Sequence, residues 1–407
     1  MYTKGFRRSG GRPFRKGVPV GGRRSSGFSG GGKRKFGKKL DVSQFINKAI
    51  ITEETEHFAP EHKFVDFDID EKIKANITEK GYELPTPIQD RAIPHILRGD
   101  DVVGVANTGT GKTGAFLIPL INKVINNLNE KVLILAPTRE LAQQIDTEFR
   151  EFAKGARIFS VCAVGGARID RQIRDLRRPH RFVIGTPGRV KDLAKRGCLK
   201  LSEFTALVLD EADRMLDMGF IADMREIVSK LPASRHTLFF SATVSGEIER
   251  IIKEFLKDPV TISVKTQETS QSVDQDVVRL KRGDNKIDVL EKLLTNSEFD
   301  KVLIFGRTKL GVEKLAEALV KKGFKAESIH GDKNQFKRQK ALELFKKSHA
   351  QVLVATDVAA RGLDINGVSH VINYDLPETY EDYVHRIGRT GRAGKSGKAL
   401  TFVIDNK

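Results

Sequence analysis

The chain has 407 residues, which is enough for two or three domains of ordinary size. Its formal net charge is +18, but residues 1–40 hold 13 of the 71 Lys and Arg residues and no Asp or Glu. The remaining 58 basic residues face 53 acidic ones, so most of the excess charge belongs to the N-terminal end. Apolar runs are far shorter than the ~20 residues of a membrane-spanning helix, and we expect neither a membrane protein nor a secretory signal.

The cysteine content indicates the compartment. Only Cys162 and Cys198 occur, and they suggest neither a disulfide framework nor a CxxC metal pair. We therefore expect a reducing, cytoplasmic setting, and we expect the chain to work as a monomer.

Composition divides the chain into a tail and a folded part. Residues 1–40 are rich in Gly, Arg, Lys and Ser, which predicts a disordered basic tail that seeks polyanions such as RNA, DNA or an acidic membrane. Residues 41–63 are expected to be a transition segment, partly helical around Asp41–Ile51. Beyond it we predict an α/β domain at 64–264, a polar linker at 265–275 and a second α/β domain at 276–407.

Short apolar runs alternate with helical patterns in both predicted domains. Because these runs are continuous rather than alternating, they favour parallel sheets covered on both faces. The expected strands are Asp101–Ala106, Val132–Ala136, Ile158–Val164, Phe182–Gly185, Ala206–Leu209, Thr237–Phe240, Val260–Val264, Val277–Leu280, Val302–Phe305, Ala326–Ile329, Val352–Ala355, Val368–Tyr374 and Ala399–Ile404. The clearest amphipathic helices are Leu141–Phe152, Glu247–Leu256, Val312–Lys321 and Gln339–Phe345.

A phosphate-binding loop is predicted between the first strand and the helix that follows it. Its residues are Ala106, Asn107, Thr108, Gly109, Thr110, Gly111, Lys112 and Thr113. The glycines let backbone N–H groups turn toward phosphates, and the helix N-terminus adds partial positive charge. Lys112 supplies a point charge to the outer phosphates, and Thr113 supplies a hydroxyl to Mg²⁺. The pattern predicts ATP with Mg²⁺ as cofactors.

Acidic residues follow the strand Ala206–Leu209 directly. Asp210 is predicted to hold Mg²⁺, largely through water, and Glu211 to accept a proton from an attacking water. Acids at a helix N-terminus can instead merely complement the helix dipole. Downstream of a phosphate loop, we favour the catalytic interpretation.

Asp210-Glu-Ala-Asp213 is the sequence that gives the DEAD-box RNA helicases, of helicase superfamily 2, their name, and the chain resembles them from about Phe64 to its end. The resemblance implies two tandem RecA-like domains. The segment Gly81–Gln89 is similar to the family's Q motif, at 64–92 here, which implies that Gln89 contacts the adenine edge and that Phe64 stacks on the ring. Asp213, Ser241 and Thr243 match positions that couple hydrolysis to unwinding.

The second domain also matches the family. Ala355–Asp364 and His385–Arg392 are similar to two of its motifs. The resemblance places Asp364 in the nucleotide site, gives His385 a coupling role, and makes Arg389 and Arg392 arginine fingers that reach the γ-phosphate. If this segment is helical, the two arginines share a face.

The family's RNA contacts can be carried over position by position. In the first domain they imply Arg139, Gly165, Gly166, Thr186 and Arg189, and in the second Gly331, Gln335, Arg338 and Thr356. Arginines pair with phosphates and glycines allow close approach, so contacts to the sugar-phosphate backbone predict little sequence preference.

The function predicted is therefore an ATP-dependent RNA helicase that unwinds RNA duplexes locally or remodels RNA–protein complexes. Two alternatives remain. An ATP-gated RNA clamp or annealing chaperone would use the same closure without unwinding, and a DNA-directed helicase would use the same paired domains on another nucleic acid.

Overall fold

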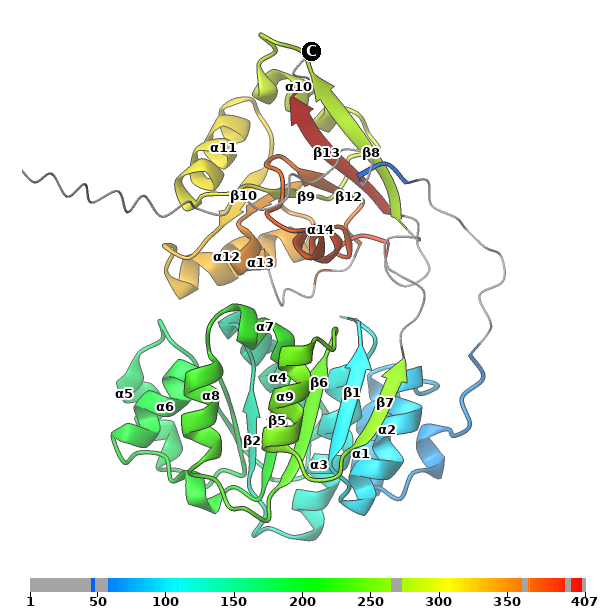
Figure 1. Ribbon diagram of the computed structural model, residues 1–407, viewed down its shortest axis with the longest axis vertical. Coiled ribbons are helices and arrows are strands. Elements are labelled where there is room, and N and C mark those ends of the chain that lie inside the picture. Colours follow the sequence, from blue (N-terminus) through cyan, green and yellow to red (C-terminus); the bar gives the residue numbers. More distant parts are fainter. Residues whose placement is uncertain are drawn as a thin grey trace, which may run out of the picture. The chain divides into compact units, whose positions relative to one another are not determined.

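The computed structural model describes residues 45–47, 58–107, 109–264, 273–360, 365, 367–391 and 397–404. The predicted tail at 1–40 and the site residues Thr108, Asp364 and Arg392 lie outside these residues. Within the described chain, two parallel sheets are each flanked by helices (Figure 1).

The first sheet has seven strands in the order β3-β4-β2-β5-β6-β1-β7, and each neighbouring pair is parallel. Its strands are β1 (Val102–Ala106), β2 (Val132–Leu135), β3 (Ser160–Ala163), β4 (Phe182–Gly185), β5 (Ala206–Leu209), β6 (His236–Ser241) and β7 (Val260–Val264). The helices are η2 (Phe64–Asp66), α1 (Glu71–Glu79), α2 (Pro87–Arg98), α3 (Lys112–Asn126), α4 (Arg139–Phe152), α5 (Ile169–Leu176), α6 (Pro187–Lys195), η3 (Leu201–Glu203), α7 (Ala212–Asp217), α8 (Ile221–Val228) and α9 (Gly246–Phe255).

The second sheet has six strands in the order β10-β11-β9-β12-β13-β8, again all parallel. Its strands are β8 (Val273–Leu280), β9 (Val302–Phe305), β10 (Ala326–Ile329), β11 (Val352–Ala355), β12 (His370–Asn373) and β13 (Gly397–Ile404). The helices are α10 (Lys286–Leu294), α11 (Lys309–Lys321), α12 (Gln335–Lys346), α13 (Asp357–Ala360) and α14 (Tyr380–Ile387).

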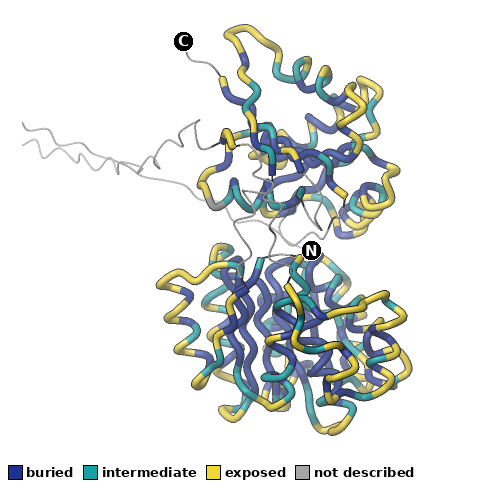
Figure 2. Tube along the Cα trace, turned by 90° about the vertical axis from the view of Figure 1, so that its right-hand side faces the viewer, coloured by how far each residue is buried: buried dark blue, intermediate teal, exposed yellow. Residues whose placement is uncertain are grey.

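Each sheet has an apolar core on both faces, because successive side chains of a strand point to opposite sides. Along β2, Val132 and Ile134 pack in one cluster while Leu133 and Leu135 pack in another. The strands of the second sheet divide in the same way. Figure 2 shows the resulting arrangement, with buried strands inside and exposed residues in the outer helices and loops.

The predicted fold class is confirmed: both domains are parallel-sheet α/β units. One local prediction is wrong. Residues 273–275, predicted as the end of the linker, lie in β8 and pair with β13. Of the stretch predicted to be partly helical, residues 41–44 and 48–51 lie outside the described residues, and Asn47 forms an antiparallel bridge with Gln275. Across the described residues, no helix combines the length and apolarity needed to cross a membrane.

Candidate active site

The predicted nucleotide residues of the first domain follow three neighbouring strands. The phosphate loop follows β1, Asp210 follows β5, and Ser241 ends β6, which pairs with both. Because the strands are parallel, their carboxyl ends meet at one edge of the sheet, where ligands of such folds bind. The sheet therefore brings the loop, the acids and the coupling segment together.

The phosphate loop is held from within and from the Q motif. Lys112 Nζ donates to the Ala106 carbonyl at 3.0 Å, so the side chain lies folded over the loop. Gln89 Nε2 donates to the Gly111 carbonyl at 3.0 Å, and its Oε1 accepts from the Thr86 N–H. Gly111 has φ 91°, and a Cβ there would lie 2.7 Å from Gln89 Nε2. Glycine is therefore required at this position.

Two predicted nucleotide contacts are buried in this structure. Phe64 is 5% exposed and packs beside Phe67 and Tyr82, so its ring is part of the core. The Gln89 amide holds the phosphate loop, although it has a second donor and acceptor capacity left. The adenine contacts of both residues stay predictions.

Asp210 and Glu211 are both buried at the carboxyl end of β5. Burial raises the pKa of Asp210 to about 6, and the nearby Lys112 offsets this only in part. Neither carboxylate oxygen of Glu211 has a hydrogen-bond partner, although Arg214 Nη1 lies 3.4 Å away. Glu211 also has φ 50°, a left-handed conformation that costs energy outside glycine. Buried carboxylate oxygens without a hydrogen bond, together with backbone strain at the same residue, are typical of a functional site.

The last acid of the motif contacts the segment after β6. Asp213 Oδ2 accepts from the N–H groups of Ala242 and Thr243 at 2.9 and 3.0 Å, and from the Thr243 hydroxyl at 3.2 Å. Burial alone would raise the pKa of Asp213, but Lys112, Arg214 and a hydrogen bond with Ser241 outweigh it and lower the pKa. Asp213 therefore links the acidic motif to the predicted coupling segment.

These groups fit a nucleotide with a divalent cation. The Glu211 oxygens, which lack hydrogen bonds, and the desolvated Asp210 carboxylate would both be stabilised by a cation beside them. Among the described residues no group of three or more His, Cys, Asp and Glu could hold a metal. Magnesium suits such a place, since it commonly keeps several waters and takes one or two carboxylates plus phosphate oxygens.

Replacing Asp210 with asparagine should stabilise the nucleotide-free protein. With its pKa raised above the usual 3.8, the folded state binds this proton more tightly than the unfolded chain does. The contribution of Asp210 to the free energy of unfolding therefore falls as pH rises from about 4 to about 6. At pH 7.5 we expect Asp210→Asn to add about 1–3 kcal/mol to the free energy of unfolding, measured in urea. The gain should shrink toward pH 4. The exposed Asp300→Asn is the control, and equal stability of Asp210→Asn and wild type at pH 7.5 would contradict the argument.

The predicted RNA residues of the first domain follow the strands on the other half of the sheet. Arg139 lies after β2, Gly165 and Gly166 after β3, and Thr186 and Arg189 after β4. These strands are neighbours in the order β3-β4-β2, so their carboxyl ends adjoin. The carboxyl edge thus has a nucleotide half and a predicted RNA half.

Contacts within this group hold the arginines in place. Gly165 and Gly166 lie beneath the Arg139 guanidinium, and a Cβ at Gly166 would overlap it. Arg189 Nη1 donates to Gln172 Oε1 at 2.9 Å, and Gln172 Nε2 donates to the Val164 carbonyl at 2.9 Å. Gln172 was not predicted as a site residue, because nothing in its local sequence indicates that it contacts Arg189.

The predicted RNA residues of the second domain also follow neighbouring strands. Gly331 and Gln335 follow β10, and Thr356 follows β11; Arg338 lies one turn into α12. β10 and β11 are neighbours, so their carboxyl ends adjoin. Arg389 follows α14, and the hydroxyl of the next residue, Thr390, donates to the carbonyls of Val368 and Ser369 just before β12, so this turn lies at the amino end of β12.

The finger segment is not a continuation of α14. The helix ends at Ile387, and Gly391 has φ 67°, which a helix cannot contain. Arg389 follows the helix end and is 3% exposed. The described part of this segment is therefore not helical, so the condition under which Arg389 and Arg392 would share a face is not met, and Arg392 lies outside the described residues.

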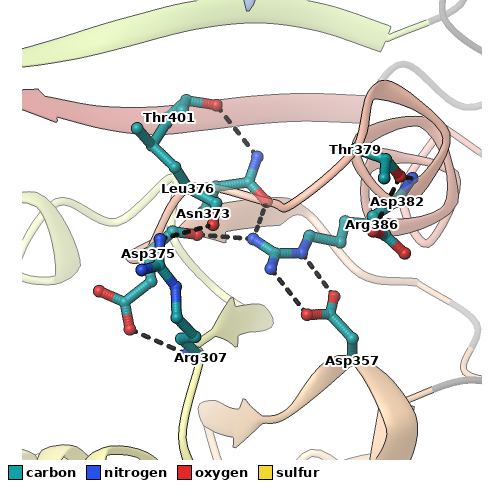
Figure 3. A network of polar contacts seen from close by, with 9 residues as sticks. All are labelled: Arg307, Asp357, Asn373, Asp375, Leu376, Thr379, Asp382, Arg386 and Thr401. Carbon is teal, nitrogen blue, oxygen red and sulfur yellow. Dashed lines mark hydrogen bonds and ion pairs between the residues drawn. The ribbon is translucent and has the colours of Figure 1, made fainter. Parts of the chain in front are cut away.

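Figure 3 shows a network around Arg386, which belongs to the motif His385–Arg392 but has no predicted role of its own. Arg386 Nε and Nη2 donate to the two carboxylate oxygens of Asp357 at 2.6 and 2.8 Å. Nη1 donates to Asn373 Oδ1 and to the Asp375 carbonyl. The guanidinium also lies 5.1 Å from the centre of the Phe305 ring. Arg386 thus fixes α14 to β12 and to the start of α13.

The Arg386–Asp357 pair is close in sequence both to a predicted RNA contact and to a predicted arginine finger. Asp357 directly follows Thr356, a predicted RNA contact, and Arg386 lies three residues before Arg389. A movement of Asp357 with the neighbouring Thr356 would therefore pull on Arg386 and on the helix α14 that precedes Arg389.

Replacing Arg386 with alanine should destabilise the second domain by about 1.5–3 kcal/mol, because it removes charged hydrogen bonds to the partly exposed Asp357 and leaves Asn373 Oδ1 and the Asp375 carbonyl without this donor. Arg386→Lys should recover little of this, since lysine cannot form two parallel hydrogen bonds. Arg307 provides a control in the same network: it is exposed, and its side chain reaches only the Leu376 carbonyl at 3.4 Å. Urea unfolding should leave Arg307→Ala near wild type, and equal stability of the two alanine variants would contradict the role of Arg386.

Comparison with known proteins agrees with this geometry. The DEAD/DEAH box helicase model matches residues 86–251, and the helicase conserved C-terminal domain model matches residues 285–394. The chain belongs to the DEAD-box helicase family. The two matched regions correspond to the two sheets, and they include the phosphate loop, the acidic motif and the finger segment.

Three relatives illustrate the likeness. The ATP-dependent RNA helicase CshA of Listeria monocytogenes is 48% identical over 343 residues, which are 84% of this chain and 66% of the relative; the chain thus spans slightly less than two thirds of it. A DEAD box protein from Methanococcus jannaschii is 39% identical, with a TM-score of 0.50 over 84% of this chain and 93% of that one. Dbp5 of S. cerevisiae, bound to RNA and ADP BeF3, is 30% identical, with a TM-score of 0.74 over 83% of this chain and 88% of that one.

Proposed function

We propose that the protein is an ATP-dependent RNA helicase that parts short RNA duplexes locally. The observation that carries this proposal is the division of the first sheet's carboxyl edge, with the phosphate loop and acidic motif on one half and the predicted RNA contacts on the other. Family membership supports the same activity. The two free cysteines agree with work in a reducing, cytoplasmic compartment.

The first domain would bind ATP through its phosphate loop. Lys112 would exchange its bond to the Ala106 carbonyl for the outer phosphates, while N–H groups of the loop bind the inner ones. Thr113 and Asp210 would hold Mg²⁺ largely through water. When bound, the ion would neutralise phosphate charge and favour attack on the γ-phosphate. Glu211 would orient the attacking water and take its proton.

The second domain would complete the site. Arg389 and Arg392 would stabilise charge that develops on the γ-phosphate during transfer to water. Because each domain contributes part of the machinery, hydrolysis requires that the two domains close on ATP. The network at Arg386 would hold the finger segment ready for this step.

RNA would bind along the other half of the first sheet's carboxyl edge and at the ends of β10 and β11. Arg139 and Arg189 would pair with phosphates, and the glycines at 165 and 166 would allow the strand to approach. If closure bends one strand into a path that a duplex cannot follow, its partner is released locally. Asp213, through Ala242 and Thr243, would transmit closure from the acidic motif to the coupling segment.

The basic segment at 1–40 would add affinity without sequence preference. Each phosphate that it neutralises should contribute about −0.7 to the slope of log affinity against log salt for a single strand. Removing residues 1–40 should therefore flatten the salt dependence of RNA binding.

The activity is tested by strand displacement together with ATP turnover. A short RNA duplex should be separated in the presence of ATP, and single-stranded RNA should stimulate turnover more than DNA of the same sequence. Equal stimulation by DNA would favour the DNA-directed helicase. Stimulated turnover without any strand separation, or with faster annealing, would favour the clamp or chaperone.

A further inference from the structure

A short segment ahead of the first domain packs on the second domain. Phe45 is 1% exposed and lies in a cluster with Val273, Tyr383, Ile387 and Ala399. Its ring centre lies 4.8 Å from that of Tyr383, in a tilted arrangement. All four cluster partners belong to β8, α14 and β13 of the second sheet and its helix.

The backbone of this segment continues the contact. Asn47 donates to the Gln275 carbonyl at 3.1 Å, and Gln275 donates to the Asn47 carbonyl at 2.7 Å. β8 is an edge strand, so these bonds use backbone groups that would otherwise face outward. The Tyr383 hydroxyl donates to Gln275 Oε1 at 3.0 Å, which ties the aromatic pair to the bridge.

The second domain buries one of two neighbouring apolar residues and leaves the other exposed. Phe45 is buried, whereas the next residue, Ile46, is 47% exposed although it is equally apolar. The buried ring and the isolated bridge at Asn47 are therefore two separate contacts of this segment with the edge of the sheet. An apolar ring in a pocket, with backbone pairing beside it, supplies both affinity and register.

We propose that residues 45–47 anchor the N-terminal segment to the second domain, so that the basic residues at 1–40 bind single-stranded RNA from that domain. Among the described residues, the first contacts of the chain with the first domain are those of Glu61 and His62 with Asp90, so without the anchor these basic residues would be attached to the first domain alone. The anchor, on the β8 edge of the second sheet, raises their effective concentration for RNA that this domain binds. This inference rests on the proposed RNA binding of the basic segment.

The anchor itself is tested by amide hydrogen exchange in the full-length protein without RNA. The Gln275 amide should be protected in wild type and in Ile46→Ala, and it should exchange about tenfold faster or more in Phe45→Ala. Phe45→Leu, which keeps an apolar side chain, should retain most of the protection. Unchanged exchange in Phe45→Ala would overturn the anchor, whatever the RNA results are.

The role of the anchor in RNA binding is tested on the same proteins over a salt series. Phe45→Ala should bind a single-stranded RNA roughly threefold to tenfold more weakly at each salt concentration, with the wild-type slope, because its charges remain but are no longer held in place. Removal of residues 1–40 should lower both affinity and slope. Wild-type affinity in Phe45→Ala would overturn the inference. An unchanged slope after removal of 1–40 would instead refute the proposed RNA binding of the segment, and the exchange result would still decide the anchor.

Discussion

Replacing Arg389 with alanine should lower RNA-stimulated ATP turnover by about 10³–10⁵-fold while ATP still binds. An arginine finger stabilises charge that appears only as the γ-phosphate is transferred, so its loss affects the chemical step more than binding. Arg389 is buried at the end of the segment that Arg386 fixes, which holds its backbone in place before nucleotide arrives. Arg392→Ala should behave in the same way.

The control for the finger variants is Arg282→Ala, which removes an exposed arginine from the same domain. Binding of a fluorescent ATP analogue and urea unfolding should be measured on all three variants, so that loss of turnover can be separated from loss of folding. If Arg389→Ala and Arg392→Ala are folded and turn over ATP at a near-normal rate, the two residues are not fingers.

Replacing Glu211 with glutamine should lower ATP turnover by about 10²–10⁴-fold, the range for loss of a general base. The amide keeps the size of the side chain but cannot take a proton from water. Because neither Glu211 oxygen has a hydrogen-bond partner, the change removes buried charge without breaking a hydrogen bond. Because the change also removes the ion pair with the buried Arg214, urea unfolding should be measured beside turnover.

The same variant distinguishes binding from hydrolysis. Glu211→Gln should hold RNA more persistently than wild type in the presence of ATP, since closure can occur but the reset by hydrolysis cannot. Dissociation of labelled RNA, with the exposed Glu247→Gln on α9 as control, measures this. Rapid release of RNA by a variant that does not hydrolyse ATP would show that hydrolysis is not the reset step.

Much of the fold was predictable because burial determines it locally. Strands such as Phe182–Gly185 and Val302–Phe305 were predicted with their observed bounds, since four continuous apolar residues between polar segments have few alternatives in a parallel sheet. The catalytic motifs were predictable for a related reason. Phosphate loops and acidic motifs place glycines, a lysine and carboxylates at fixed offsets from such strands.

Other features depend on residues that are far apart in the sequence. The Arg386–Asp357 pair joins residues in two different motifs, and no local pattern indicates which arginine of the segment turns inward. The bridge between Asn47 and Gln275 joins the two ends of a segment more than 200 residues long, so periodicity around either residue could not predict it. The end of α14 depends on Gly388 and Gly391, which a simple spacing argument for Arg389 and Arg392 overlooked.

The central claim is that ATP and RNA are bound by the same closed arrangement of the two domains. It is tested most directly by measuring the affinity for a non-hydrolysable ATP analogue with and without single-stranded RNA, and the affinity for RNA with and without the analogue. Closure on both ligands predicts that each tightens the other by the same factor, of about 5- to 150-fold. Affinities that do not change in either direction would contradict the account.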